Sequence, residues 1–273
     1  MNKKFFIGVD SDGTAFNSMS IKHKNAFIPI FIEIWGYSEH REAVTQICER
    51  INLYSKTRGI DRFSGLLLTF DEIKRHGIET PDYRSLRGFL KCGALSNAGL
   101  REYIRQNKDD FLENVLLWSE AADKKFKYEV KDLMPFANVK KTLRKAFENA
   151  DIAVISSASE ESLKADWKKD GLSEYISRIF GQEFGKKSEQ LRVYSDRYAD
   201  GCKLMIGDAE GDLKAAQSAG AFFFPIIPGA EENSWEELYE VYLDIFFGGG
   251  FADFQQELTD KFYMSLTDER SYL

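Results

Sequence analysis

Short apolar runs and longer helical patterns alternate along the chain, and together they predict an α/β protein. Helical patterns at residues 137–149 and 212–219 separate the later runs. This alternation is typical of a parallel sheet with helices on both faces, so we expect a Rossmann-like, doubly wound sheet. Four runs have the length and composition of buried strands, namely Phe5–Val9, Ile152–Ile155, Leu204–Ile206 and Phe222–Ile227.

The region between residues 16 and 134 has a different pattern. Apolar residues recur there at helical spacing, as in Phe27, Phe31 and Ile34, and no convincing strand run is found. A structureless loop of this length would be unusual in a compact domain. We therefore predict that residues 17–134 form an all-helical domain, inserted into a sheet domain of residues 1–16 and 135–273.

Residues 229–273 are expected to form a helical extension of the sheet domain. The segment from Trp235 to Tyr263 is rich in aromatic residues, with a spacing that fits two amphipathic helices around three consecutive glycines at 248–250. Their apolar faces either pack over the sheet domain or form a dimer contact, and pattern alone favours packing. We expect a monomer or a homodimer.

Composition narrows the range of partners. The formal net charge of the 273 residues is −7, and basic residues are dispersed among acidic ones, which argues against nucleic acid as a partner. The three cysteines form no Cys-x-x-Cys pair and are expected to be reduced thiols. Neither a signal peptide nor a membrane-spanning segment is recognisable. We expect a cytoplasmic protein without a membrane partner.

Two carboxylates follow the first predicted strand. Asp10 and Asp12 stand where the run Phe5–Val9 ends, and Gly13 allows the chain to turn so that both acids reach one ligand. Two acids this close repel each other unless a positive charge lies between them, and a hard cation suits their oxygen atoms. Taken alone, the pattern also fits a metal-dependent glycosyltransferase, a receiver domain or an ordinary Asp/Gly turn.

Three further features occupy similar positions. Ser156 and Ser157 follow the second strand run, where a hydroxyl either binds a phosphoryl oxygen or caps a helix. Lys186 and Lys187 precede a helical pattern, and such a pair is either a solvated basic pair or a source of positive charge for a phosphate site. Asp208 and Asp212 follow the third run, where their carboxylates either face the same ligand-binding site at the strand ends or serve as helix caps.

The ordered set of these features resembles the four motifs of the haloacid dehalogenase superfamily. The set is Asp10-x-Asp12-Gly13-Thr14, then Ser156, then Lys187, then Gly207-Asp208-x-x-x-Asp212. The resemblance covers residues 1–16 and about 135–227, and it implies that the helical insert is a cap domain. It also implies a Rossmann-like core and an enzyme that depends on Mg²⁺.

The resemblance assigns a role to each motif residue. Asp10 would be the nucleophile that forms an aspartyl phosphate, and Asp12 would be the general acid and then the base. Lys187, or Lys186 beside it, would stabilise the charged intermediate. Ser156, Ser157 and Thr14 would bind the phosphate or hold its loop. The metal set would be Asp10, Asp12 through its carbonyl, Asp208 and Asp212.

Asp12 selects among the chemistries of this superfamily. Dehalogenases of the family keep no acid two positions after the nucleophile, because halide leaves without a proton. The resemblance therefore implies a phosphatase that hydrolyses a small phosphorylated metabolite. The alternatives are a phosphomutase or phosphotransferase that uses the same intermediate and, from another class, a non-catalytic ligand-binding protein.

A short loop in the predicted cap is similar to a cap loop of β-phosphoglucomutase relatives. The shared element is the Gly-x-x-Arg pattern that runs from Gly59 to Arg62. Arg58 or Arg62 would then bind a remote phosphate or carboxylate of the substrate. The alternative is a loop with two surface arginines, which is more common for this residue type.

Overall fold

The computed structural model describes residues 3–129 and 133–266, which form two compact units. Of the described residues, one unit contains 3–18 and 133–266, and the other contains 19–129. The ends of the predicted domain ranges at residues 1–2, 130–132 and 267–273 lie outside the described residues. Among the described helices, none combines the length and the apolar character that a bilayer crossing requires.

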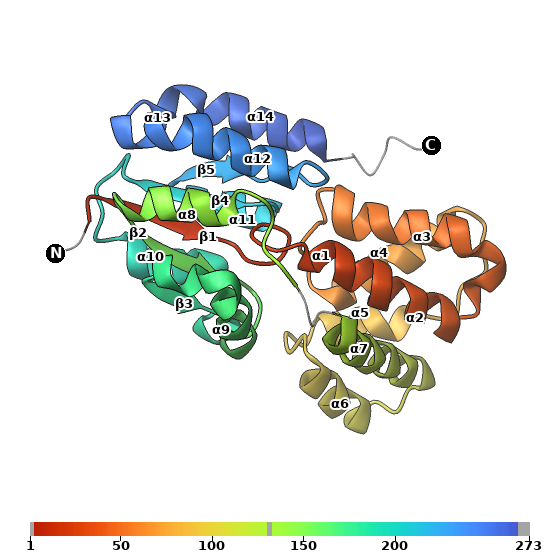
Figure 1. Ribbon diagram of the computed structural model, residues 1–273. Helices are drawn as coiled ribbons and strands as arrows, with labels where there is room; N and C mark the ends of the chain where they lie inside the picture. Colours follow the sequence, from red (N-terminus) through yellow and green to blue (C-terminus); the bar gives the residue numbers. More distant parts are fainter. Residues whose placement is uncertain (1–2, 130–132, 267–273) are drawn as a thin grey trace. The chain divides into compact units, whose positions relative to one another are not determined.

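The first unit is built on a five-stranded parallel sheet with strand order β3-β2-β1-β4-β5 (Figure 1). Every strand pair is parallel, with Phe5 opposite Ala150 and Phe6 opposite Lys203 in the central register. The predicted fold class, a Rossmann-like parallel sheet, is confirmed. The strands are β1 (Phe5–Val9), β2 (Ala150–Ile155), β3 (Arg178–Phe180), β4 (Lys203–Gly207) and β5 (Phe222–Pro225).

Helices connect these strands and extend beyond the last one; η marks 3-10 and π turns. They are α8 (Val139–Phe147), α9 (Glu160–Lys168), η4 (Lys169–Tyr175), η5 (Gln182–Phe184), α10 (Lys187–Ser195), α11 (Glu210–Ser218), α12 (Glu231–Glu237), η6 (Leu238–Tyr242), α13 (Leu243–Gly248), η7 (Phe251–Phe254) and α14 (Gln255–Ser265).

Alternation along β1 shows how the sheet is covered on both faces. Successive strand side chains point to opposite faces, and Phe5 and Phe6 accordingly meet different helices. The ring of Phe5 packs against Phe246 of α13, with centroids 5.1 Å apart. Phe6 belongs to the core cluster on the other face, which includes Leu191 of α10 and Leu213 of α11. The sheet is therefore buried on both sides, as its continuous apolar strands predict.

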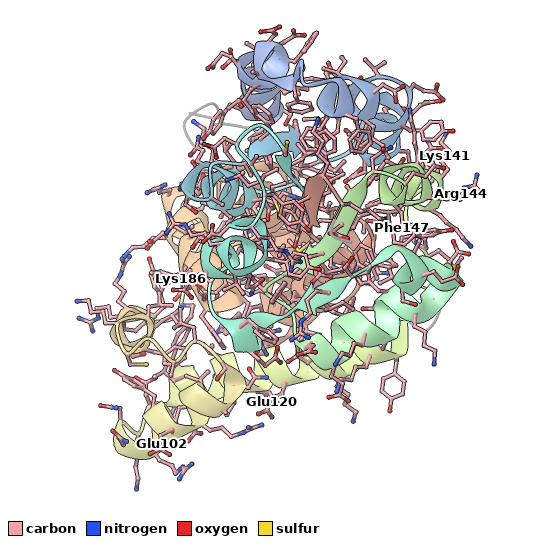
Figure 2. All side chains as sticks on the ribbon, turned by 90° about the vertical axis from the view of Figure 1, so that its left-hand side faces the viewer. Glu102, Glu120, Lys141, Arg144, Phe147 and Lys186 are labelled. Atoms are coloured by element: carbon pink, nitrogen blue, oxygen red, sulfur yellow. The ribbon has the colours of Figure 1, made fainter. Side chains whose placement is uncertain are left out.

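Helix α8 illustrates how the sequence pattern produces this packing. Val139, Leu143 and Ala146 recur at helical spacing and are buried. Arg144 lies between them in sequence but is exposed, as the view of Figure 2 shows. The helix thus turns its apolar side to the unit's core and a basic side to solvent.

The C-terminal segment packs on the sheet of its own unit. It was expected to form two helices, but the described residues form α12, α13 and α14 with 3-10 and π turns between them. Along the outer strand β5, the side-chain amide of Gln255 accepts a hydrogen bond from Phe223 N at 2.8 Å and donates one to Phe223 O at 3.2 Å. Aromatic contacts such as Phe223 with Phe262, 5.4 Å apart, bury the segment.

The second unit is a separate bundle of helices around its own core. That core combines buried aliphatic residues with aromatic ones, among them Phe31, Phe70 and Phe89. Helix α2 begins at Ile28 directly after a π turn, with Pro29 in its first turn. From Ser18 onward the elements are α1 (Ser18–Ile21), η1 (Lys22–Phe27), α2 (Ile28–Ile34), η2 (Tyr37–His40), α3 (Arg41–Glu49), η3 (Arg50–Tyr54), α4 (Arg62–Arg75), α5 (Arg84–Leu90), α6 (Asn97–Gln106) and α7 (Asp110–Glu129).

Candidate active site

The Asp10–Thr14 loop leaves the carboxyl end of β1 and turns back on itself. Gly13 has a φ of 82°, a left-handed conformation that costs glycine little, and its N–H donates to Phe16 O at 2.8 Å. The backbone N–H groups of Ala15 and Phe16 both donate to Ser11 O. This tight turn brings Asp10 and Thr14 inward, where both side chains are buried.

Two more carboxylates come from the junction of β4 and α11. Asp208 follows the end of β4, and Asp212 lies in the first turn of α11. The carboxylate of Asp212 accepts a hydrogen bond from Ala209 N at 3.1 Å. Gly207 makes room for this arrangement, because a Cβ at that position would lie 2.4 Å from the Cβ and Cγ of Asp212.

Lys187 contacts one acid that follows β1 and one that follows β4. It is the first residue of α10, and its Nζ donates to Asp10 Oδ1 at 2.8 Å and to Asp212 Oδ1 at 2.7 Å. The side chain of Lys187 is 17% exposed. Lys186, one residue earlier, is exposed at the surface (Figure 2). Of the two lysines, the structure therefore brings Lys187 to the acids.

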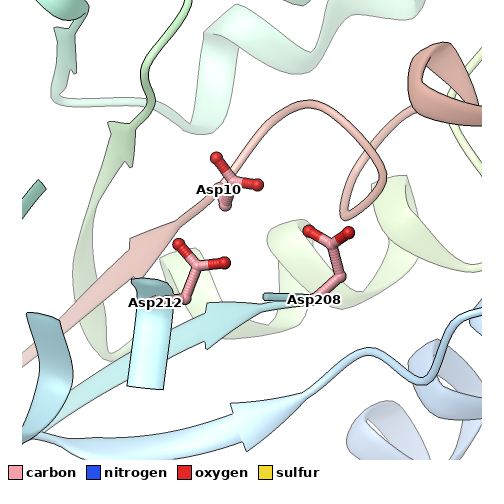
Figure 3. A group of neighbouring side chains, drawn as sticks. All are labelled: Asp10, Asp208 and Asp212. Atoms are coloured by element: carbon pink, nitrogen blue, oxygen red, sulfur yellow. The ribbon is translucent and has the colours of Figure 1, made fainter. Parts of the chain in front are cut away.

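Asp10, Asp208 and Asp212 form a buried group of carboxylates (Figure 3). One oxygen atom from each lies within 4.8 Å of the others, and the three residues are at most 3% exposed. Carboxylate oxygens are among the ligands that Mg²⁺ prefers. The donor set therefore fits a divalent cation. The side chain of Asp12 is not a member of this group, and the predicted role of the Asp12 carbonyl stays a prediction.

For both Asp10 and Lys187, burial and the ion pair between them shift the pKa in opposite directions. Burial raises the pKa of Asp10 well above its usual range, and Asp212 and Asp208 raise it further, whereas Lys187 lowers it. Burial alone would lower the pKa of Lys187, but the Asp10 and Asp212 carboxylates outweigh it and raise the pKa above its usual range. The lysine thus stays charged, while burial disfavours the ionised form of Asp10.

Hydroxyl groups complete the polar contacts around the loop. The hydroxyl of Thr14 donates to Asp208 Oδ1 at 2.6 Å and lies 3.3 Å from Asp10 Oδ2. The hydroxyl of Ser18 donates to Asp12, whose side chain is only partly buried. Asp12 is therefore nearer to solvent than Asp10, which suits a group that exchanges protons.

The predicted phosphate-binding serines follow β2, the neighbour of β1. Ser156 is 2% exposed, and its Oγ accepts a hydrogen bond from Ala158 N at 3.2 Å, whereas Ser157 is exposed. Gln190 of α10 donates to the carbonyls of Ser156 at 3.1 Å and of Gly185 at 2.9 Å. The β2 end is thus tied to the loop that precedes Lys187. Phosphate binding by these serines stays a prediction.

Comparison with known proteins identifies the family. Residues 89–226, half of the chain, match the family model of haloacid dehalogenase-like hydrolases. The chain belongs to this family. The matched range of this haloacid dehalogenase-like hydrolase includes Ser156, Lys187, Asp208 and Asp212. It ends before the C-terminal helices. A comparison with curated protein sequences finds no match.

Several solved structures are similar to this haloacid dehalogenase-like hydrolase. A putative β-phosphoglucomutase from Thermotoga maritima has a TM-score of 0.51 at 14% identity, over 88% of this chain and 100% of that chain. A haloacid dehalogenase-like family hydrolase from Streptococcus pneumoniae has a TM-score of 0.45 at 17% identity, over 86% and 90%. A predicted phosphoglycolate phosphatase from Haemophilus somnus has 0.46 at 15% identity, over 82% and 86%.

The two arginines predicted to contact substrate are engaged within the helical unit. Arg58 is 3% exposed and donates through Nη1 to Leu53 O at 2.7 Å. The alternative interpretation, a surface arginine, is therefore wrong for Arg58. Arg62 donates to Ser119 Oγ and to Asp123 Oδ1, each at 2.8 Å. A substrate contact of Arg58 or Arg62 stays a prediction.

Two residues that contact the Asp10–Thr14 loop were not predicted as site residues. The indole of Trp167 on α9 donates to Ser11 Oγ at 3.0 Å, and the indole of Trp235 on α12 donates to Thr14 O at 2.8 Å. These contacts span 156 and 221 residues of sequence. Local periodicity gives no signal for them, since both tryptophans fit ordinary core positions.

Proposed function

We propose that this chain is a cytoplasmic, magnesium-dependent phosphomonoester hydrolase that acts on a small phosphorylated metabolite. The observation that carries the proposal is the contact of Lys187 with both Asp10 and Asp212 inside a buried group of three carboxylates. A lysine in this position can neutralise both an attacking carboxylate and an incoming phosphate. The resemblance of the ordered motifs to the phosphatase branch supports the same assignment.

Charge balance supports a divalent cation at this site. Asp10, Asp208 and Asp212 contribute three negative charges when ionised, and Lys187 supplies one positive charge, which leaves two negative charges. Buried charges need partners of opposite sign. When bound, Mg²⁺ would supply that charge and polarise a phosphoryl oxygen. Asp10, Asp208 and Asp212, with the Asp12 carbonyl, would hold it.

In the first step, Asp10 acts as the nucleophile. One carboxylate oxygen of Asp10 attacks phosphorus, and the bond from phosphorus to the ester oxygen breaks. Asp12 donates its proton to the leaving oxygen, so the product departs as an alcohol. Lys187 holds the attacking carboxylate in place and balances its charge. The product of this step is an aspartyl phosphate on Asp10.

In the second step, Asp12 acts as the base. It takes a proton from a water molecule, whose oxygen attacks phosphorus while the bond to the Asp10 oxygen breaks. Inorganic phosphate is released, and Asp12 is again protonated. Ser18, which donates a hydrogen bond to Asp12, stabilises its ionised form and orients it between the two steps. Ser156, Ser157 and Thr14 would hold the phosphate or its loop.

The two units would have different functions, catalysis and substrate selection. The sheet unit, with residues 1–16 and 135–273 as its predicted range, would be the catalytic core. The helical unit, predicted as residues 17–134, would be a cap that selects the substrate and limits access of water. Arg58 or Arg62 would contact a remote anionic group of the substrate.

The test is phosphate release from a panel of phosphomonoesters, measured with Mg²⁺ and with a chelator. We expect turnover that requires the metal and that falls by about 1000-fold or more in Asp10→Asn. Asp200→Asn is the matched control, because the Asp200 side chain is 100% exposed and pairs with Lys203 at the start of β4, at the opposite end of the strand from Asp208. This control is expected to keep the activity of the wild type.

Other outcomes would select the alternatives. Phosphate that moves from one ester to a second hydroxyl, without release of inorganic phosphate, would show a phosphomutase or phosphotransferase. A folded protein that binds Mg²⁺ but neither releases nor transfers phosphate would contradict the proposal and favour a non-catalytic binding protein.

A further inference from the structure

The Asp10–Thr14 loop is tied at two points to tryptophans from distant parts of the same unit. Trp167 donates to the side chain of Ser11, between the two acids of the loop, and Trp235 donates to the backbone carbonyl of Thr14, where the loop ends. Both tryptophans are fully buried. The two contacts therefore hold the loop at its middle and at its end.

The indole N–H distinguishes these residues from ordinary core aromatics. A phenylalanine fills much of the same space, but tryptophan adds one donor that must find an acceptor when it is buried. At both positions the acceptor is an atom of the loop. The ring of Trp167 also meets Phe16 edge-on at 5.8 Å, just beyond the loop. Packing and hydrogen bonding thus act on the same short segment.

The Trp235 contact leads directly to the carboxylate group. Thr14, whose carbonyl accepts the indole N–H, uses its hydroxyl to donate to Asp208 at 2.6 Å and lies 3.3 Å from Asp10. A shift of Thr14 would therefore move a hydrogen-bond partner of both acids. Trp235 lies beyond the residues that match the family model, so the C-terminal helices of this chain support the site as well.

We propose that Trp167 and Trp235 are positioning residues that fix the Asp10–Thr14 loop for phosphoryl transfer, with Trp235 acting on the metal site through Thr14. The proposal rests on the proposed function for its kinetic consequences. Its consequence for metal affinity stands independently, because binding of Mg²⁺ alone requires no substrate.

The test compares Trp167→Phe and Trp235→Phe with Tyr198→Phe as a matched control. Tyr198 is 7% exposed, and its hydroxyl donates to Asp151 near the start of β2, away from the Asp10–Thr14 loop at the carboxyl ends of the strands. The control thus loses one buried donor and keeps its aromatic ring, whereas each tryptophan variant loses one buried donor and also replaces the indole by a smaller ring. All three variants are expected to lower the melting temperature, and the two tryptophan variants more than the control because they leave a cavity.

The kinetic and binding readouts separate positioning from stability. We expect both tryptophan variants to lower kcat for a phosphomonoester by about 10- to 100-fold, with KM within about 3-fold, because a buried acceptor of the loop is left unpaired. Trp235→Phe is also expected to weaken Mg²⁺ binding, measured by calorimetry, by about 5-fold or more. Tyr198→Phe is expected to keep kcat and Mg²⁺ affinity.

Wild-type kcat and Mg²⁺ affinity in both tryptophan variants would overturn the proposal. Should a variant fail to fold, Trp235 is replaced by 3-benzothienylalanine. In this residue sulfur takes the place of the indole N–H, and the shape of the ring is kept. Unchanged Mg²⁺ affinity would then refute the role of Trp235. If the wild-type protein hydrolyses no ester, the proposed function fails, and Mg²⁺ affinity still decides whether Trp235 positions the site.

Discussion

Substitution of Gly207 by alanine tests how closely the site is packed. The added Cβ would lie 2.4 Å from two carbon atoms of Asp212 and 2.6 Å from its Oδ2. Carbon atoms in contact are normally about 3.5–4.0 Å apart, so Asp212 must move by about 1 Å. That movement breaks or stretches its hydrogen bonds with Lys187 and Ala209.

The expected cost follows from these contacts. Overpacking costs about 1–3 kcal/mol, and one lost hydrogen bond adds about 1 kcal/mol, so Gly207→Ala should lower the free energy of unfolding by about 2–4 kcal/mol. Since a 1 Å misplacement can reduce activity about 100-fold, a loss of that order in phosphate release is expected. Denaturant unfolding and phosphate release measure the two effects.

Gly211 provides the control within the same motif. A Cβ at Gly211 meets nothing within 4 Å, and the residue lies inside α11. Gly211→Ala should therefore stabilise the protein by about 0.5–1 kcal/mol through helix propensity and leave Asp212 in place. The reasoning would be refuted if Gly207→Ala matched the wild type in both stability and activity.

Two further predictions concern a lysine and a thiol. Lys187→Met should reduce phosphate release by about 100-fold or more, because Asp10 and Asp212 lose their shared cation, whereas Lys186→Met should stay within about 2-fold in the same assay. Equal losses in both would contradict the assignment. Burial raises the pKa of Cys48 to about 12 from an ordinary value of 9.0, so native protein at pH 8 should react with a thiol reagent at the exposed Cys92 and not at Cys48. The Cys48 thiol loses its proton at lower pH in the unfolded chain than in the folded protein. The free energy of unfolding, measured by denaturant titration, should therefore fall as pH rises from about 9 to 12. Cys48→Ala should reduce that pH dependence.

The sheet could be predicted from sequence because its strands are continuous apolar runs. Phe5–Val9 was predicted with its observed bounds. The third strand, Arg178–Phe180, was not predicted, since it has only three residues and its first is exposed. A strand so short gives no periodic signal, and only its pairing with β2 defines it.

The site could be predicted in part, because several of its residues directly follow predicted strands. Strand ends mark where side chains can gather, and the structure brings Asp10, Asp208, Asp212 and Lys187 together there. The sequence could not decide between the two adjacent lysines, because that choice depends on where α10 begins. Nor could it reveal Trp235, whose contact with the loop depends on the path of the whole C-terminal segment.

The amide of Gln255 also has a consequence for self-association. Unpaired N–H and C=O groups on an outer strand are a template on which a second chain can add its own strand. On β5, Gln255 already occupies the donor and the acceptor of Phe223, as a neighbouring strand would. A second copy that joined edge to edge at β5 would first have to displace this side chain and the helix that carries it. If the protein forms a homodimer, its interface should therefore lie elsewhere than along this strand.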